Sequence, residues 1–227
     1  MKLPNSDAET THVEVAALLF DIDGTLVDST PAVERTWRAW AARRGLDAEA
    51  ILAVCHGRRS EDTIADFLPV AERPNAVAEL EGLEFEDVAD VVALPATKDL
   101  LAGLPSDRWA AVTSGSRRLM RKRLAAAGLP VPDVLVGADD VTVGKPAPEG
   151  YLAAAAALGV DPAECLVVED APAGIAAGQA AGARVLAVAT SHDASVLTQA
   201  DMLVTDLRDV ALIMMERGLR ISLRTAV

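Results

Sequence analysis

The chain has 227 residues, of which 51% are hydrophobic, so it is long enough for one domain or for one domain with a modest insertion. Its formal net charge of −13 repels nucleic acid and anionic membranes, and no apolar run is long enough to cross a bilayer. The two cysteines, Cys55 and Cys165, form no CxxC pattern, which argues against a disulfide framework and a zinc site. We therefore expect a cytoplasmic protein, a monomer or a weak dimer, that binds neither nucleic acid nor membrane.

The expected secondary structure alternates between strands and helices. The polar segment 1–12 has no feature of a secretory signal, and we expect a frayed leader before the first strand. Short apolar, β-branched runs predict buried parallel strands at residues 13–20, 109–113, 134–136, 165–168, 184–188 and 202–204. Helical patterns occupy residues 98–104, 117–127, 148–158 and 173–181, and a glycine follows each of the last three. This order predicts an α/β fold with a Rossmann-like, doubly wound parallel sheet.

A long interval separates the first strand from the next. Residues 31–94 contain no convincing strand and are too many for a loop in a compact domain. Helix-start signals follow one another there, at Thr30 with Pro31, Asp47, Ser60 and Asn75. We therefore expect a small all-α domain at residues 31–94, inserted after the first strand, and an α/β core made of residues 1–30 and 95–227.

Two aspartates directly follow the first strand. Asp21 and Asp23 should therefore lie at the carboxyl end of a parallel strand, where such sheets place their ligands. Alternation is expected to send both side chains to one side, and two like charges so close are costly unless a cation or a shared proton offsets them. Taken alone, the pair is by default interpreted as a solvated, aspartate-rich turn that ends at Gly24.

Further motifs along the chain decide between these readings. Residues 21–26, Asp-Ile-Asp-Gly-Thr-Leu, resemble the opening motif of the haloacid dehalogenase superfamily, and the later motifs of that family follow in the same order. Ser114 and Gly115 come after a strand, and the resemblance implies that their hydroxyl and N–H bind phosphate. Lys145, in a Gly-Lys-Pro sequence, resembles the lysine that holds the nucleophile and the phosphoryl group together.

The resemblance implies a magnesium-dependent phosphatase. Glu169 and Asp170 match the acidic last motif, in which Asp170 binds Mg²⁺ and Glu169 bonds the ion directly or through water. Asp21 and the backbone carbonyl of Asp23 are the other implied protein ligands. Asp21 is the implied nucleophile, which forms an aspartyl-phosphate while Lys145 offsets charge, and Asp23 is the implied general acid and base. Dehalogenase members lack that second aspartate, so the sequence favours phosphoryl transfer.

The inserted helical segment matches the cap that closes over the active site in many members of this family. Residues 55–62, Cys-His-Gly-Arg-Arg-Ser-Glu-Asp, resemble the cap loop of sugar and polyol phosphatases such as the glycerol-phosphate and 2-deoxyglucose-6-phosphate enzymes. We therefore expect His56, Gly57, Arg58 and Arg59 at the substrate, a small phosphate ester. Either arginine alone is equally typical of a surface charge.

Two other functions stay open. Sugar-phosphate mutases of the β-phosphoglucomutase kind share the cap and all the motifs, but they place a histidine where this chain has Val33 and a cap lysine where it has His56. Hydrolysis is therefore favoured over mutase action. The absence of lysine from residues 31–94 argues against the Schiff-base mechanism of related phosphonate hydrolases. A non-catalytic binding or regulatory module is the third reading, and the intact motifs argue against it.

Overall fold

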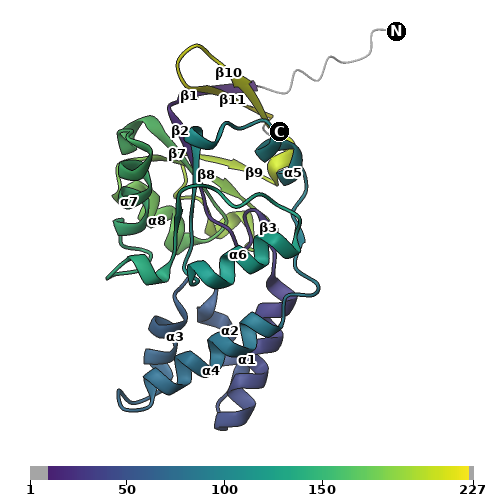
Figure 1. Ribbon diagram of the computed structural model, residues 1–227, viewed down its shortest axis with the longest axis vertical. Coiled ribbons are helices and arrows are strands. Elements are labelled where there is room, and N and C mark those ends of the chain that lie inside the picture. Colours follow the sequence, from purple (N-terminus) through teal and green to yellow (C-terminus); the bar gives the residue numbers. More distant parts are fainter. Residues whose placement is uncertain (1–9, 225–227) are drawn as a thin grey trace.

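A computed structural model describes residues 10–224 and has a six-stranded parallel sheet at its centre (Figure 1). The strands are β2 (Ala17–Phe20), β5 (Trp109–Val112), β6 (Leu135–Val136), β7 (Cys165–Glu169), β8 (Arg184–Val188) and β9 (Met202–Val204). They lie in the order β6-β5-β2-β7-β8-β9, and every neighbouring pair is parallel. The predicted parallel sheet is confirmed.

Helices cover both faces of this sheet. They are α5 (Thr97–Ala102) and α6 (Arg117–Ala126) on one face, and α7 (Glu149–Leu158) and α8 (Pro172–Ala180) on the other. Successive side chains of β2 point to opposite faces of the sheet. Leu18 belongs to the apolar cluster that contains Leu119 of α6, whereas Leu19 belongs to the cluster that contains Ala154 of α7. The fold is therefore the doubly wound α/β sheet that the sequence predicts.

The first predicted strand, residues 13–20, is in fact two strands. The chain breaks at Ala16, whose N–H donates to the Glu164 carbonyl over 2.7 Å. Strand β1 (Thr10–Val15) leaves the parallel sheet and pairs antiparallel with β11 (Leu219–Arg224), which pairs with β10 (Val210–Met214). The prediction of one parallel strand is therefore wrong for its first half. The predicted leader overlaps β1 at residues 10–12, and its remaining residues lie outside the described part of the chain.

Four helices form the inserted segment and lie beyond one end of the sheet (Figure 1). These cap helices are α1 (Thr30–Arg44), α2 (Ala48–Cys55), α3 (Ser60–Phe67) and α4 (Arg73–Glu86). They bury an apolar cluster of their own, in which the rings of Trp37 and Trp40 meet edge to face at 5.4 Å and Trp40 Nε1 donates to the Ala76 carbonyl. Helix α4 begins two residues before Asn75, with Pro74 in its first turn.

A short ladder lies where the chain enters and leaves the inserted segment. Strand β3 (Val27–Asp28) pairs antiparallel with β4 (Val92–Ala93). The expectation of no strand in residues 31–94 is therefore wrong for β4, which is too short to show a pattern in the sequence. The domain boundaries at residues 30 and 95 stay a prediction.

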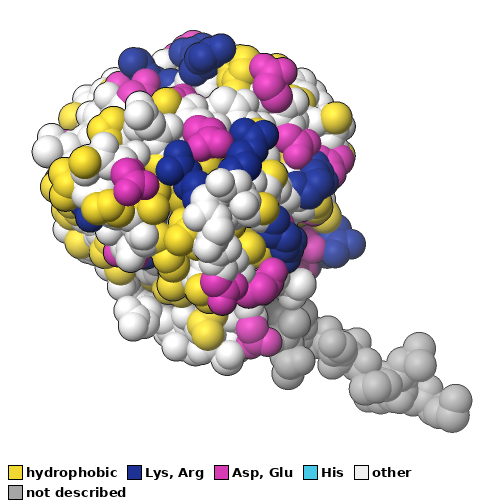
Figure 2. Space-filling view, turned by 90° about the horizontal axis from the view of Figure 1, so that it is seen from below, with side chains coloured by type: hydrophobic (Ala, Val, Ile, Leu, Met, Phe, Trp, Pro, Cys, Tyr) yellow, Lys and Arg dark blue, Asp and Glu magenta, His cyan; other side chains and the backbone are white. Residues whose placement is uncertain are grey.

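The charges of the cap end are mixed. Figure 2, which views this end, shows Lys and Arg side chains interspersed with Asp and Glu side chains. Ion pairs account for part of this pattern, since Glu79 pairs with Arg43 and Arg44, and Arg38 pairs with Glu34. Such exposed pairs contribute little stability, about 0–1 kcal/mol each. Between residues 10 and 224, no helix combines the length and the apolar character that a membrane span requires.

Candidate active site

The motif residues meet at one edge of the parallel sheet. Asp21 directly follows β2, Asp170 directly follows β7, and Ser114 lies two residues after β5. These three strands are neighbours in the order β5-β2-β7, so their carboxyl ends lie side by side. Lys145 joins them from the loop before α7, 124 residues from Asp21 in sequence.

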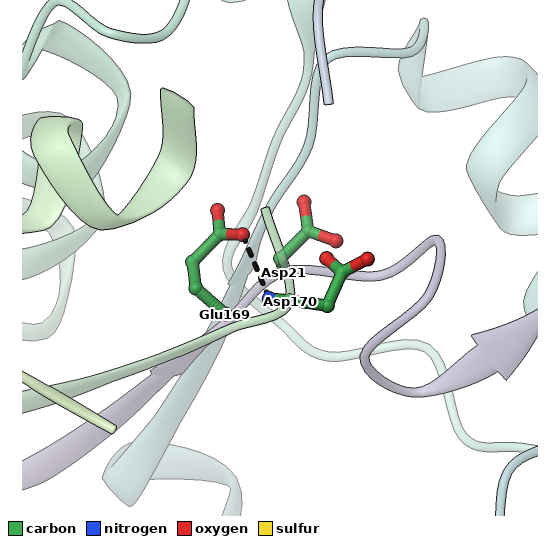
Figure 3. A group of neighbouring side chains, drawn as sticks. All are labelled: Asp21, Glu169 and Asp170. Atoms are coloured by element: carbon green, nitrogen blue, oxygen red, sulfur yellow. Dashed lines mark hydrogen bonds between the residues drawn. The ribbon is translucent and has the colours of Figure 1, made fainter. Parts of the chain in front are cut away.

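A buried cluster of charge forms the floor of the site. Lys145 Nζ donates to Asp21 Oδ1 and to Glu169 Oε1, each over 2.6 Å. Carboxylate oxygens of Asp21, Glu169 and Asp170 lie within 4.8 Å of one another, as Figure 3 illustrates. Burial, opposed by Lys145, raises the pKa of Asp21 well above its ordinary value. Burial by itself would lower the pKa of Lys145, but the two adjacent carboxylates raise it.

This cluster fits a divalent cation. Three buried carboxylates face one ammonium group, which leaves negative charge that a cation would offset. Their oxygens are the hard ligands that magnesium and similar ions prefer. Asp170 also accepts hydrogen bonds from Thr25 Oγ1 over 3.2 Å and from Ser191 Oγ, which fix its orientation. Burial, followed by repulsion from Glu169, raises the pKa of Asp170 to about 7.

Glu169 differs from the other two carboxylates in its partners. Its Oε1 accepts from Lys145 and from the Tyr151 hydroxyl, each over 2.6 Å, and its Oε2 accepts from the N–H groups of Asp170 and Ala171. A side chain on Gly174 would overlap this carboxylate. These contacts fix the Glu169 carboxylate beside Lys145, and its direct or water-mediated contact with a cation stays a prediction.

Asp23 is held by a separate set of contacts. Its Oδ1 accepts from Ser29 Oγ and its Oδ2 accepts from Arg123 Nη1, each over 2.7 Å. Both Asp21 and Asp23 line one pocket, as alternation predicts, but only Asp21 contacts Lys145. The carboxylate of Asp23 is not part of the acidic cluster, so its predicted role as a metal ligand depends on its backbone carbonyl and stays a prediction.

The pocket above this floor has a volume of about 80 Å³ and lies between the core and the cap helices. Ser114 Oγ donates to the carbonyl of Gly57 in the cap loop over 2.9 Å, and the Gly115 N–H donates to Thr113 Oγ1 over 3.1 Å. Both predicted phosphate-binding groups therefore have protein partners in this structure. A phosphate bound there would have to replace these hydrogen bonds.

The cap loop places its two arginines differently. His56, Gly57 and Arg58 line the pocket, whereas Arg59 does not. Arg59 pairs with Asp62 over 2.8 Å and donates to a carbonyl of the core loop before Lys145, so it joins cap to core. Of the two candidates, Arg58 is thus the one at the pocket. Burial, followed by repulsion from the nearby His192, lowers the pKa of His56, which favours the neutral imidazole.

Sequence reasoning missed Arg123 and Glu84, a buried pair that also lines the pocket. A signal for Arg123 was present, since the predicted helix 117–127 places it on the same face as Leu119, Met120 and Leu124. An arginine on an apolar helix face requires an acidic partner, because an unpaired buried charge is costly. No comparable pattern in the sequence marks Glu84 as a pocket residue, because its partner Arg123 lies 39 residues away.

The chain belongs to the haloacid dehalogenase-like hydrolases, whose family model matches residues 15–182. It is 43% identical to hexitol phosphatase A of Escherichia coli over 208 residues, 88% of this chain and 95% of that protein. It is 38% identical over 199 residues to glycerol-1-phosphate phosphohydrolase 2 of Saccharomyces cerevisiae, 82% of this chain and 80% of that protein. These matches confirm the predicted family and the predicted enzyme class, a phosphoric monoester hydrolase.

Solved structures agree on the fold. A β-phosphoglucomutase of Clostridium difficile matches with a TM-score of 0.73 over 85% of this chain and 91% of that one. Its sequence identity is 23%, so this match bears on the arrangement of helices and strands and not on the reaction.

Proposed function

We propose that this protein is a magnesium-dependent phosphatase that hydrolyses a sugar or polyol phosphate through an aspartyl-phosphate on Asp21. The observation that carries the proposal is the 2.6 Å contact between Lys145 and Asp21, which lines the pocket together with Asp170. The two curated relatives described above are named for hexitol and glycerol-1-phosphate substrates, which supports a polyol phosphate here.

In the first step a carboxylate oxygen of Asp21 forms a bond to phosphorus while the bond from phosphorus to the ester oxygen breaks. Lys145, already bonded to Asp21, orients the attacking carboxylate and offsets its repulsion from the phosphate. Ser114, Gly115 and the cap residues His56, Gly57 and Arg58 are the proposed phosphate and substrate contacts. Arg58, whose guanidinium pairs with Asp66 over 2.9 Å, would have to turn from that partner to add positive charge at the phosphate.

Asp23 is the proposed proton donor and acceptor. It gives a proton to the departing alkoxide, then removes one from the water that attacks the aspartyl-phosphate, which restores Asp21 and releases inorganic phosphate. Ser29 and Arg123 fix its carboxylate from two sides, so the group is oriented before the substrate arrives.

Magnesium is the proposed metal. Asp21, Asp170, the Asp23 carbonyl and, through water, Glu169 would hold it, and waters and a substrate oxygen would complete six oxygen ligands. When bound, the ion supplies positive charge against the phosphoryl oxygens. A cytoplasmic location and a monomer or weak dimer stay predictions of the sequence.

Mutase action is the second candidate, and one residue weighs against it. Val33 lines the pocket where the resembling mutases place a histidine, and its side chain can neither relay a proton nor bond to Asp23. Phosphorus NMR with a hexose 1-phosphate and a trace of the bisphosphate separates the two. Release of inorganic phosphate supports the proposal, whereas interconversion to the 6-phosphate with little free phosphate would establish a mutase.

A panel of phosphorylated polyols and sugars, with p-nitrophenyl phosphate as a reference, tests the proposal as a whole. We expect magnesium-dependent phosphate release that Asp21→Asn abolishes while the circular dichroism spectrum stays native. A protein that hydrolyses none of these esters with magnesium would be a non-catalytic module, and the proposal would be wrong.

A further inference from the structure

The proposed reaction gives no role to Glu84, the acidic member of an ion pair in the wall of the pocket. Arg123 on α6 and Glu84 on cap helix α4 meet over 3.3 Å, and their side chains are only 3% and 9% exposed. The pair thus joins the core to the cap beside the substrate space. Burial, only partly opposed by Arg123, raises the pKa of Glu84, which indicates how costly a charge is at this position.

The hydrogen-bonding capacity of this pair is not used up by the protein. Arg123 donates from Nη1 to Asp23 and from Nη2 to Glu84, but its buried Nε has no hydrogen-bond partner among the described residues. Within residues 10–224, the only side-chain hydrogen bond of Glu84 is the long one from Arg123. A guanidinium has five N–H donors and a carboxylate accepts about four hydrogen bonds, so donors and acceptors remain side by side.

A hydroxyl group fits this arrangement, because it donates and accepts at once. It can donate to Glu84 while it accepts from Arg123. A second anionic group would be repelled by Glu84, and an apolar group would leave Arg123 Nε and the remaining acceptor capacity of Glu84 unpaired. The ligand chemistry that matches the pair is therefore a neutral hydroxylated carbon chain.

The position of the pair indicates which hydroxyl it meets. Arg123 bridges Glu84 to Asp23, the group proposed to protonate the ester oxygen. A substrate whose ester oxygen meets Asp23 would therefore bring its nearest carbons toward Arg123 and Glu84, which line the same pocket.

We propose that Glu84 and Arg123 form a hydroxyl-recognition site that selects phosphate monoesters with a hydroxyl group on the carbon adjacent to the ester carbon or on the one after it. This inference rests on the proposed phosphatase function and extends it to substrate choice. A site built to bond a hydroxyl rejects an analogue without one, because its own polar groups then stay unpaired.

The wild-type enzyme provides the first test. Glycerol 3-phosphate and n-propyl phosphate have the same carbon chain, and only the first has hydroxyl groups. We expect kcat/KM to favour glycerol 3-phosphate by roughly 10²-fold or more. Equal values would overturn the inference while leaving a working phosphatase. Failure to hydrolyse either ester or p-nitrophenyl phosphate would instead overturn the proposed function on which it rests.

The second test compares two variants of α4. Glu84→Gln keeps the size but removes the charge and replaces one acceptor oxygen with an NH2 donor, and it should lower the ratio of kcat/KM between the two esters by at least about tenfold. Glu81→Gln is the matched control, because Glu81 is also on α4 and also contacts the core, through Ser116 over 2.7 Å, but does not line the pocket. It should keep the wild-type ratio. An unchanged ratio in Glu84→Gln, or the same fall in both variants, would assign Glu84 to cap packing alone.

Discussion

Lys145 donates a hydrogen bond of 2.6 Å from Nζ to Oδ1 of Asp21, and both side chains are buried at the carboxyl edge of the sheet. The two residues are 124 positions apart, so the contact exists only in the folded chain. It places a fixed positive charge where a nucleophilic carboxylate would meet a negatively charged phosphate. The first prediction follows from this pair.

Replacing Lys145 with alanine should lower kcat by roughly 10²–10³-fold, because a preorganised charge beside the reacting groups is lost. Asp21 and Glu169 would then lack their ammonium partner beside Asp170, so magnesium should raise the melting temperature more in this variant than in the wild type. Steady-state rates and thermal melts with and without magnesium measure both effects. A rate within threefold of wild type would contradict the assigned role.

The raised pKa of Asp170, about 7 because of burial and then Glu169, predicts a pH dependence of the metal-free protein. A free aspartate titrates near pH 3.9, so the folded chain holds this proton more tightly than the unfolded chain. The free energy of unfolding should therefore fall as pH rises from about 4 to about 7. Magnesium should bind more weakly below pH 7, since a proton competes with it.

Chemical denaturation in EDTA, repeated between about pH 4 and pH 7, tests whether the free energy of unfolding falls as pH rises. Asp170→Asn removes the titrating group, so its unfolding free energy should fall less steeply with pH than that of the wild type. Identical slopes would show that other groups cause the dependence.

Gly174 should be intolerant of even a methyl group. A Cβ at this position would overlap the carboxylate of Glu169, which holds Lys145, so Gly174→Ala should destabilise the fold by about 1–3 kcal/mol and lower kcat. Gly82 is the matched control, since it also lies within a helix but has open space around it. Gly82→Ala should leave kcat unchanged and raise stability by about 0.5–1 kcal/mol. Equal effects of the two substitutions on kcat would refute the explanation.

Substitutions of the two neighbouring cap arginines, Arg58 and Arg59, should affect different properties of the enzyme. Arg58→Ala should raise KM for a phosphate ester by about tenfold or more, because Arg58 lines the pocket. Arg59→Ala should act mainly on stability, because Arg59 ties the cap loop to Asp62 and to the core. Measuring KM and melting temperature for both variants decides this. A larger KM effect from Arg59→Ala would reverse the assignment.

The sequence predicts most of the parallel sheet and the floor of the site because their signals are local. Asp21 directly follows β2, Asp170 directly follows β7 and Ser114 lies two residues after β5, and neighbouring parallel strands bring such ends together. The break at Ala16 had no such signal, since residues on both sides of it are apolar and fit one continuous strand. The sheet of β1, β10 and β11 depends on pairing between the two ends of the chain.

The walls of the pocket were harder to predict for a related reason. The neighbours Arg58 and Arg59 look alike in the sequence, and their directions are set by Asp66 and Asp62 of α3, the helix that begins directly after them. Glu84 reaches the pocket only because α4 packs beside α6. Contacts between distant elements, with no repeat or motif to mark them, become visible only in the folded structure.

The aspartyl-phosphate on Asp21 is the central claim, and Asp23→Asn with p-nitrophenyl phosphate tests it most directly. The p-nitrophenolate group leaves without a proton, so Asp21 should still be phosphorylated, whereas hydrolysis of the phosphoenzyme needs the base that is missing. Rapid mixing should therefore show a burst of about one p-nitrophenolate per active site, and acid quenching should trap phosphate on the peptide that contains Asp21. The double variant with Asp21→Asn should show neither. Phosphate release by the wild type, with no burst and no phosphoprotein in Asp23→Asn, would contradict nucleophilic catalysis by Asp21.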